Sequence, residues 1–318
     1  MEMFNSALGR NITLVRPAYF FIGGFVGVPN IKYYYVFLLI VYVVCVLGNS
    51  LVMVVIVVDH KLRSPKNVVV FNLAFTDLLT STVLVPKVLD TFMLEHRAIA
   101  YNDCLAFVFF YFSCLSMQSL NLVALGCDRT VAILLPLRYQ QVVTIRSARL
   151  LVAALWLYAI TLALMAAGLL TRLSFCRSVV INSYICDHGP MYRLGCNDIT
   201  PSRVIAGLST ALVLWVPLVI ILSSYVFIGY TLTRISTPQE RIKALKTCSG
   251  QLSLVAVFYL PIIFVYRFGW TIHPNARIIN LSLTAVLPPL LNPIIYTLQT
   301  QEIRKSVRRL LRGNKIAA

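Results

Sequence analysis

Long apolar runs alternate with short polar segments along almost the whole chain. Each of seven runs is 20 to 30 residues long and holds at most one charged residue. A helix rises about 1.5 Å per residue, so about 20 apolar residues cross the hydrocarbon core of a bilayer. The pattern therefore predicts seven membrane-spanning helices. The runs are Tyr33–Val58, Asn67–Pro86, Cys104–Cys127, Leu150–Thr171, Val204–Thr233, Thr247–Tyr266 and Ile278–Thr300.

The same runs favour helices over the strands of a membrane β-barrel. They lack the alternation of polar and apolar residues typical of barrel strands, and they are about twice as long. In lipid, a helix satisfies its backbone amides within its own segment. The runs cover about half of the 318 residues, which leaves too little chain for a separate soluble domain. We expect an all-α membrane protein whose seven-transmembrane helix bundle spans residues 33–300.

The segment after the last run has a different pattern. Its apolar residues are spaced at i, i+4, i+7 and i+8, and basic residues lie between them, which predicts a short amphipathic C-terminal helix on a membrane surface. The apolar positions are Ile303, Val307, Leu310 and Leu311, and the basic ones are Arg304, Lys305, Arg308, Arg309 and Arg312. No cysteine follows Cys248, so we expect no palmitate anchor in residues 301–318.

Basic residues are distributed unevenly between the two predicted sides of the membrane. Leaving aside Lys87 and Arg129, which lie at the ends of runs, the segments on the side of the C-terminus hold 16 Lys and Arg residues, and those on the other side hold 10. The positive-inside rule therefore places the C-terminus in the cytoplasm and residues 1–32 outside the cell. The glycosylation sequon at Asn11 agrees with this orientation. We expect no cleaved signal peptide, because the polar segment Met1–Arg16 precedes an apolar run that is too long for one.

The composition supports a membrane protein and limits its partners. Only 12 % of the residues are charged, against about 25 % in soluble domains. The net charge of +17 could suggest nucleic acid. However, these basic residues lie in short loops between apolar runs, where anionic membrane lipid is the expected partner. We expect no nucleic-acid partner.

Four of the eight cysteines lie on the predicted outer side, namely Cys104, Cys176, Cys186 and Cys196. Thiols on the oxidising side of a membrane indicate two disulfides, and four cysteines allow three pairings. A zinc site is the competing interpretation. The nearest histidine is His188, and neither CxxC nor HxxxH spacing occurs. We expect no metal site.

Two sets of polar residues lie within or at the ends of the runs. Asp77 stands alone in the middle of the second run, and an ionisable residue at that depth is a candidate functional group. It could also tie helices together through Asn49 and Asn292, which lie at comparable depths. Asp128 and Arg129 follow the third run, where an isolated arginine would only reach towards water.

Short motifs in a fixed order favour a functional role for Asp128 and Arg129, whereas for Asp77 a helix tie and a switch element both stay open and do not exclude each other. The motifs at Gly48-Asn49, Leu73–Asp77, Asp128-Arg129, Trp156 and Asn292–Tyr296 resemble the rhodopsin-like G-protein-coupled receptors. A more specific set resembles the vertebrate odorant receptors. It comprises Pro86–Leu89, Asp128–Tyr139, Ser224-Tyr225, Lys243-Ala244 with Thr247-Cys248, Phe258-Tyr259 and Pro289–Tyr296. The resemblance covers about residues 20–312, and Ser116–Ser119 with Pro261 favour the fish-like class.

This resemblance implies a function, a location and roles for residues. It implies that a small odorant binds from the extracellular side of the plasma membrane, in cilia of olfactory sensory neurons, and that an olfactory Gs-type heterotrimeric G protein then raises cAMP. It implies no enzyme activity and no cofactor. It also implies the disulfides Cys104–Cys186 and Cys176–Cys196. The residues implied to form the switch are Asp77, Asp128, Arg129, Tyr225, Asn292, Pro293 and Tyr296.

Three positions depart from the family pattern. Thr130 stands where a tyrosine is usual, Gln251 stands where histidine is common, and Gln118 replaces a usual glutamate. Gln118 removes a charge from any cation site shared with Asp77. The departures leave Asp77 and Arg129 in place, so we expect an intact switch with altered basal activity.

The ligand pocket is expected to open outward between the third, fifth, sixth and seventh helices. The candidate lining residues are Tyr111, Phe112, Leu115, Ser116, Ser209, Thr210, Tyr259, Ile262, Ile263, Tyr266 and Ser282. Arg267 could anchor a carboxylate, or it could be an exposed loop residue. The third run has Tyr111 and no acid on its inner face, which argues against an amine ligand. Asp187 and His188 could form a lid.

Other membrane protein classes fit the sequence less well. An opsin needs a lysine in the seventh run, and Ile278–Thr300 has none. A zinc-dependent membrane hydrolase needs histidines at bilayer depth, and a transporter usually has repeated halves. Pro217, Pro261 and Pro293 instead suit hinges within a switch. The alternatives kept are a rhodopsin-like receptor for a non-odorant metabolite outside the olfactory system and an adhesion or scaffold protein that needs no Arg129.

Overall fold

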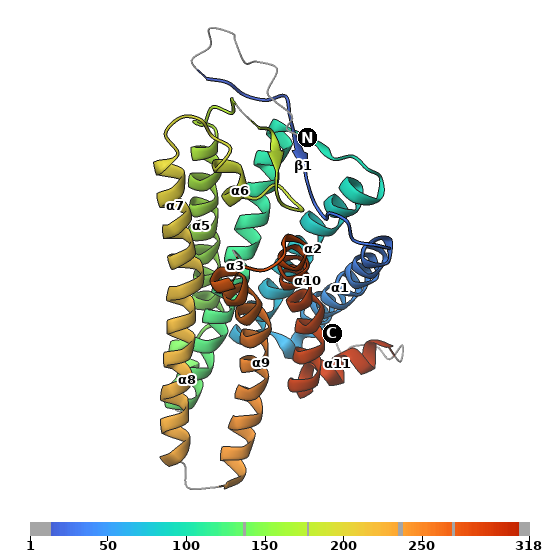
Figure 1. Cartoon of the computed structure of the whole chain (residues 1–318). Coiled ribbons are helices and arrows are strands. Elements are labelled where there is room, and N and C mark those ends of the chain that lie inside the picture. Colours follow the sequence, from blue (N-terminus) through green and yellow to red (C-terminus); the bar gives the residue numbers. More distant parts are fainter. Residues whose placement is uncertain (1–13, 136–137, 177, 235–237, 269–270, 312–318) are drawn as a thin grey trace.

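Seven membrane-spanning helices form one bundle (Figure 1), as the apolar runs predict. The computed structural model describes residues 14–135, 138–176, 178–234, 238–268 and 271–311. The spans are α1 (Lys32–Val58), α2 (Pro65–Met93), α3 (Tyr101–Leu134), α5 (Ile145–Leu170), the continuous set α7 (Thr200–Thr210), η2 (Ala211–Trp215) and α8 (Val216–Arg234), α9 (Pro238–Phe268) and α10 (Pro274–Gln299). Short elements η1 (His60–Leu62), α4 (Tyr139–Val142) and α6 (His188–Tyr192) lie between them.

Local chemistry sets where several helices begin, beyond the apolar runs themselves. The Ser64 hydroxyl accepts a hydrogen bond from the Asn67 amide, and Pro65 occupies the first turn of α2. Thr144 and Ser147 form a reciprocal capping box at the start of α5. Such caps satisfy amides that have no partner within the helix. The helices therefore extend into the polar loops, past the ends predicted from hydrophobicity alone.

Two prolines free backbone carbonyls inside the bundle, and polar side chains from other helices bind them. Pro217 has no amide hydrogen, and the carbonyl four residues earlier belongs to Val213, in the π-helical turn η2. Ser119 Oγ donates to that carbonyl at 2.5 Å. Pro293 likewise frees the Pro289 carbonyl, which Asn49 Nδ2 reaches at 2.9 Å. Both hinges are thus tied to a neighbouring helix.

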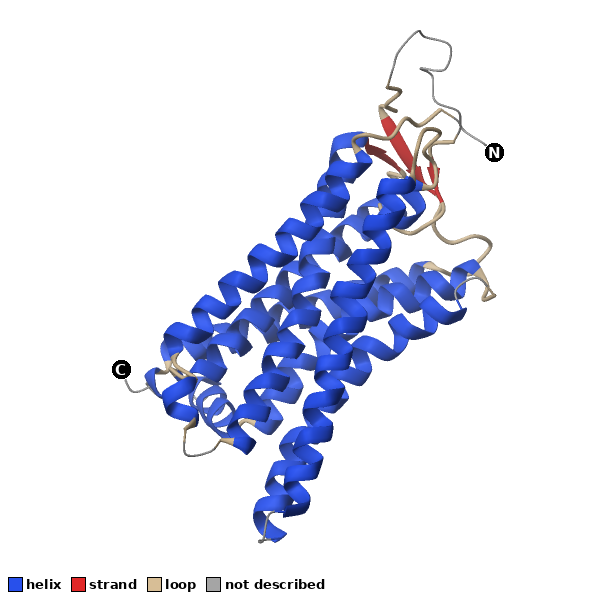
Figure 2. Cartoon of the chain, turned by 90° about the vertical axis from the view of Figure 1, so that its left-hand side faces the viewer, coloured by secondary structure: helices blue, strands red, loops and turns tan. Residues whose placement is uncertain are grey.

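A small three-stranded sheet at the outer end was not predicted. Strand β1 (Tyr19–Ile22) pairs antiparallel with β2 (Ala98–Ala100) and parallel with β3 (Val180–Ile181). Figure 2 shows these strands gathered at one end of the bundle. Disulfides between Cys104 and Cys186 and between Cys176 and Cys196 fasten the same region. The sheet and disulfides together form a cover, which we call the outer lid.

Two apolar cores lie one above the other within the bundle. The outer core contains Phe20 and Phe175 of the lid region, and it reaches Val286 of α10. The inner core joins Leu73, Leu125 and other side chains at the opposite half. Large apolar side chains on the outside of the bundle, such as those of Leu47, Leu157 and Val226, are exposed. Their exposure fits contact with hydrocarbon chains.

Helix α11 (Gln301–Leu311) confirms the predicted short amphipathic C-terminal helix. Ile303 and Val307 are buried, whereas Lys305 and Arg308 are exposed. The helix crosses the inner end of α1 and α10 (Figure 1). The Ser306 hydroxyl donates a hydrogen bond to the buried Asp59 carboxylate, which follows α1. The side chains of Leu311 and Arg312 and the sequon at Asn11 lie outside the described residues.

Candidate functional site

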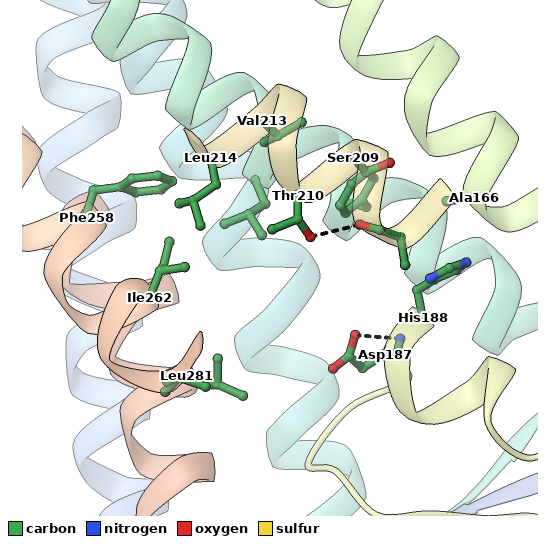
Figure 3. A pocket seen from close by; sticks show the side chains of 15 residues that line it. Ala166, Asp187, His188, Ser209, Thr210, Val213, Leu214, Phe258, Ile262 and Leu281 are labelled. Atoms are coloured by element: carbon green, nitrogen blue, oxygen red, sulfur yellow. Dashed lines mark hydrogen bonds between the residues drawn. The ribbon is translucent and has the colours of Figure 1, made fainter. Parts of the chain in front are cut away.

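A cavity of about 310 Å³ opens beneath the outer lid. It lies between α3, α7, η2, α9 and α10, and the segment around α6 closes one side (Figure 3). Its size is at the lower end of the range of small-molecule sites. The lining residues are Phe112, Leu115, Ala166, Asp187, His188, Gly189, Ala206, Ser209, Thr210, Val213, Leu214, Phe258, Ile262, Val265 and Leu281.

Five of the candidate ligand-binding residues line this cavity: Phe112, Leu115, Ser209, Thr210 and Ile262. Several lining residues missed by sequence reasoning lie one helical turn from these. Leu214 follows Thr210 by four positions, and Phe258 precedes Ile262 by four. The 3.6-residue period of a helix places such pairs on one face, so periodicity alone could have found them.

The remaining candidates lie elsewhere. Ser116 Oγ donates to the Phe112 carbonyl of its own helix, and Ser282 Oγ lies 2.5 Å from the Tyr34 hydroxyl. Tyr111 stacks on Phe107. Arg267 is exposed and its guanidinium lies 5.6 Å from the centre of the Phe268 ring. Ile263 does not line the cavity, and the Tyr266 side chain lies outside the described residues.

The polar groups of the cavity lie at its outer end. Figure 3 shows Asp187 across the cavity from Ile262 and Leu281, whereas Val213 and Phe258 lie at the other end. Asp187 caps α6, and its Oδ1 accepts from the Gly189 amide at 3.3 Å. Burial raises the pKa of Asp187, although the Gly189 amide and two arginines act in the opposite direction. The cavity is therefore amphipathic.

His188, next to Asp187, is a second polar group of the same wall. Only 9 % of the residue is exposed, and Nε2 has no hydrogen-bond partner within the described part of the chain. Burial lowers the pKa of His188 to about 4, although its contact with the Ala166 carbonyl favours the protonated form. The imidazole is therefore neutral at physiological pH and can accept one hydrogen bond.

A hydrogen-bonded group lies directly below the cavity. Tyr259 is buried, and its hydroxyl lies 2.7 Å from Ser119 Oγ, which in turn bonds the Val213 carbonyl. Tyr259 was predicted to line the pocket, but its ring lies beneath it because its hydroxyl points to α3. Val213 and the neighbouring Phe258 do line the cavity. Ser119, Val213 and Tyr259 thus connect α3, η2 and α9 directly below the cavity, where a bound ligand would press on them.

The polar centre of the bundle gathers around Asp77, which is fully buried. Its two carboxylate oxygens accept from Gln118 Nε2 at 2.9 Å and from Asn292 Nδ2 at 2.6 Å. Asn49 does not bond Asp77, because its amide donates to backbone carbonyls of α1 and α10 instead. Asp77 thus joins α2, α3 and α10. It bonds Asn292, as the helix-tie interpretation expects, but the expected bond to Asn49 is wrong.

The inner end holds the other predicted switch residues, most of them apart from one another. Arg129 Nε is 4.0 Å from the Asp128 carboxylate, which also accepts from the Tyr139 hydroxyl at 2.6 Å. Tyr225 donates to Gln251 at 3.1 Å. The buried hydroxyl of Tyr296 has no hydrogen-bond partner among the residues that the structure describes.

Pro293, the remaining predicted switch residue, packs against the first helix. A Cβ atom added to Gly48 would lie 3.4 Å from the Pro293 ring, so the glycine lets α1 and α10 approach closely. Such a close contact at a proline hinge leaves little room for a larger side chain.

Seven spanning helices, a cavity of small-molecule size beneath the outer lid and a polar cluster around Asp77 at the centre of the bundle are consistent with a membrane receptor of the rhodopsin-like class. Comparison with known sequences agrees, since the family model described as "Olfactory receptor" matches residues 38–314. Relatives include olfactory receptor 1500 of Rattus norvegicus, 32 % identical over 89 % of this chain and 91 % of that protein. Olfactory receptor 52B2 of Homo sapiens is 34 % identical over 93 % of each chain.

The chain belongs to the olfactory receptor family. It is a multi-pass membrane protein, and its family consists of receptors and not of enzymes. Membership implies small-molecule odorants and G proteins as partners.

Proposed function

We propose that this chain binds a small odorant in the outer cavity and activates a Gs-type G protein that raises cAMP. The observation that carries the proposal is the continuity between the outer cavity and the polar centre around Asp77. Cavity residues Val213 and Phe258 contact or adjoin the Ser119–Tyr259 pair, and Phe258 also lines the small cavity beside Asp77. A ligand that presses on the outer end can therefore bias the polar centre.

The proposed mechanism is a shift between two arrangements of the bundle. Arg129, Tyr225 and Tyr296 are proposed to rearrange together and to admit the C-terminal helix of a G-protein α subunit. The Tyr296 hydroxyl and Arg129 Nε are buried without hydrogen-bond partners in the described part of the chain, although Arg129 Nε lies 4.0 Å from the Asp128 carboxylate. Such groups are costly to leave without hydrogen bonds, so a second arrangement that supplies these bonds gains stability from them. A ligand shifts this equilibrium only by its differential affinity for the two states.

The proposed location follows from the same function. We propose the plasma membrane, with residues 1–32 outside, glycosylation at Asn11, and the cilia of olfactory sensory neurons as the site of use. The outer lid with its two disulfides supports an oxidising outer side. Residues 301–318 are proposed to contact the inner leaflet through the basic face of α11.

The test is a cAMP response screen in cells that express this chain with a Gs-type α subunit. Carboxylates, amino acids, alcohols, aldehydes, amines and steroids are presented in turn, and the strongest agonist is then applied to Arg129→Ala. We expect a dose-dependent response that this variant loses while its surface expression stays unchanged. Arg138→Ala, an exposed basic residue of the same inner face, is the matched control. An unchanged response of Arg129→Ala would reject the receptor mechanism.

A further inference from the structure

The chemistry of the outer cavity points to the class of molecule that it binds, an inference that rests on the proposed function. Most of the lining is aliphatic or aromatic, so the body of the ligand must be apolar. The polar side chains are confined to one part of the wall: Asp187, His188, Ser209 and Thr210. One polar head group on an apolar body therefore matches the site better than a molecule that is polar throughout.

Three of these four polar side chains can each form a further hydrogen bond with a ligand. His188 Nε2 and the buried Ser209 hydroxyl have no partner within the described residues. Asp187 belongs to none of the ion pairs found in that part of the chain, and the hydrogen bond that its carboxylate accepts from the Gly189 amide is long at 3.3 Å. By contrast, Thr210 already donates to the Ala206 carbonyl at 2.8 Å.

The hydrogen bonds that these three side chains can still form are mainly ones in which the side chain is the acceptor. A carboxylate only accepts hydrogen bonds, a neutral imidazole accepts at its unprotonated nitrogen, and a hydroxyl can do either. A ligand head group must then supply the hydrogen. A carboxylate ligand would instead meet the negative charge of Asp187 in a largely apolar site, where like charges repel strongly.

No arginine or lysine in the described part of the chain lines the cavity and could pair with a ligand carboxylate, and Arg277 and Arg193 act on Asp187 from outside the cavity. Arg267, the predicted carboxylate anchor, lies outside it against Phe268. The third helix has no acid on its inner face, as predicted, but Asp187 of the outer loop supplies a carboxylate to the cavity. In the sequence, Asp187 is interpreted only as part of a possible lid and not as a partner for an amine.

We infer that the cavity selects small apolar molecules whose single head group donates a hydrogen bond, a protonated primary amine or an alcohol, and that it rejects carboxylates. Asp187 and His188 receive the head group at the outer end. Val213, Leu214 and Phe258 surround the apolar body at the inner end. The ligand thereby touches the residues that adjoin the Ser119–Tyr259 pair.

The experiment uses the purified full-length chain in lipid nanodiscs and four probes with a common cyclohexylmethyl body. The probes are the amine, the alcohol, the methyl ether and cyclohexylacetic acid. Apparent affinity is measured from the dependence of the thermal transition on probe concentration. We expect the amine and the alcohol to bind at least tenfold more tightly than the ether and the acid.

Two variants then assign the selectivity to its residues. Asp187→Asn keeps an acceptor but loses the charge, so the affinity for the amine falls at least tenfold and that for the alcohol falls less. Asp198→Asn is the matched control, because Asp198 is an exposed acid of the same outer face that accepts a hydrogen bond from the Thr200 amide and does not line the cavity. It leaves the affinity for both probes unchanged.

Several outcomes would overturn the inference: equal affinity for the acid and the alcohol, no effect of Asp187→Asn, or no binding of any probe. If Asp187→Asn does not fold, the wild-type series still decides, since it needs no variant. The same samples are tested for nucleotide exchange on a G protein. Head-group selectivity without exchange rejects the proposed function alone, and exchange driven best by carboxylates rejects the inference alone.

Discussion

The two ends of this bundle are held together by different kinds of bonds. The outer end is fastened by two disulfides, a three-stranded sheet and a continuous aromatic core. The inner end has an apolar core of its own, but its helices are joined there by side-chain hydrogen bonds such as that from Tyr225 to Gln251, and no disulfide lies there among the described residues. The covalent ties of the outer end suit it to keep a cavity in shape, whereas the non-covalent ties of the inner end can exchange partners.

The largest effect is expected at the outer end, from the Cys104–Cys186 bond. It joins residues 82 positions apart, and the Cys176–Cys196 bond joins residues 20 apart. Closing the longer loop removes more entropy from the unfolded chain, about 4.5 kcal/mol against about 3 kcal/mol. Cys186→Ser should therefore lower the thermal transition and the surface level more than Cys196→Ser. Thermal melts in nanodiscs provide the measurement, and the reverse order would show that the lid does not depend on the tie to α3.

His188 is expected to make the outer end sensitive to acid. Burial lowers its pKa to about 4, so the unfolded chain binds the extra proton first as the pH falls below about 6.5. The contribution of the neutral His188 to the free energy of unfolding is therefore fully present above pH 6.5, and it decreases as the pH falls to 4. At about 1.4 kcal/mol per pH unit the loss reaches about 3 kcal/mol.

A series of thermal melts between pH 7 and pH 4 tests whether stability falls as the pH falls. Asp187 shifts the balance the other way, because burial raises its pKa, so the series is run in an Asp187→Asn background. The His188 imidazole has Asp187 and Tyr192 as charged and polar neighbours on its own segment. From α5, the backbone carbonyl of Ala166 also faces it. His188→Phe should flatten the slope, and His60→Gln at the inner end should not. An equal slope in all variants would contradict the assignment.

A smaller effect is expected at the junction between the ends. Ser119→Ala leaves the Val213 carbonyl, freed by Pro217, without its donor. A buried unpaired carbonyl costs about 1–3 kcal/mol. Ser116→Ala is the matched control, since the Ser116 hydroxyl only adds a second hydrogen bond to the Phe112 carbonyl of its own helix. Thermal melts should separate the two variants by more than 1 kcal/mol, and identical melts would remove the junction from the account.

The smallest effect is expected at the inner end, where α11 is held to α1. Ser306→Ala removes the hydrogen bond to Asp59, which we place at the lower end of the range for a charged acceptor, about 1.5 kcal/mol. That bond, with help from the Lys61 amide, lowers the pKa of Asp59, so its contribution is present above pH 4 and is lost in stronger acid. Hydrogen exchange of α11 amides should quicken in this variant. The exposed control Glu302→Gln should leave exchange unchanged.

Much of the fold could be predicted because it depends on local physics. A run of 20 apolar residues such as Thr247–Tyr266 must form a helix in lipid whatever surrounds it. The sheet could not be predicted in this way, since Tyr19–Ile22 pairs with strands about 80 and 160 positions away. Asn49 also shows the limit: its depth suggested Asp77 as a partner, but the rotation of α1 turns it to the Pro289 carbonyl.

The candidate site was predicted best where it lies on helices. Phe112 and Leu115 follow from helical spacing, and so would Leu214. Asp187 and His188 belong to a loop that folds back over the bundle, and loop paths depend on contacts such as the disulfide at Cys186 and not on periodicity. The family resemblance indicated the switch residues, but it could not indicate what bonds each one makes.

The most direct test of coupling between the two ends is nucleotide exchange on a purified Gs-type α subunit by the chain in nanodiscs. The strongest agonist from the cAMP screen is added to wild type and to Arg129→Ala. We predict that the agonist accelerates exchange by wild type, that Arg129→Ala loses the acceleration and that its agonist affinity stays similar. No acceleration under any agonist or basal condition, or full acceleration by Arg129→Ala, would contradict the account.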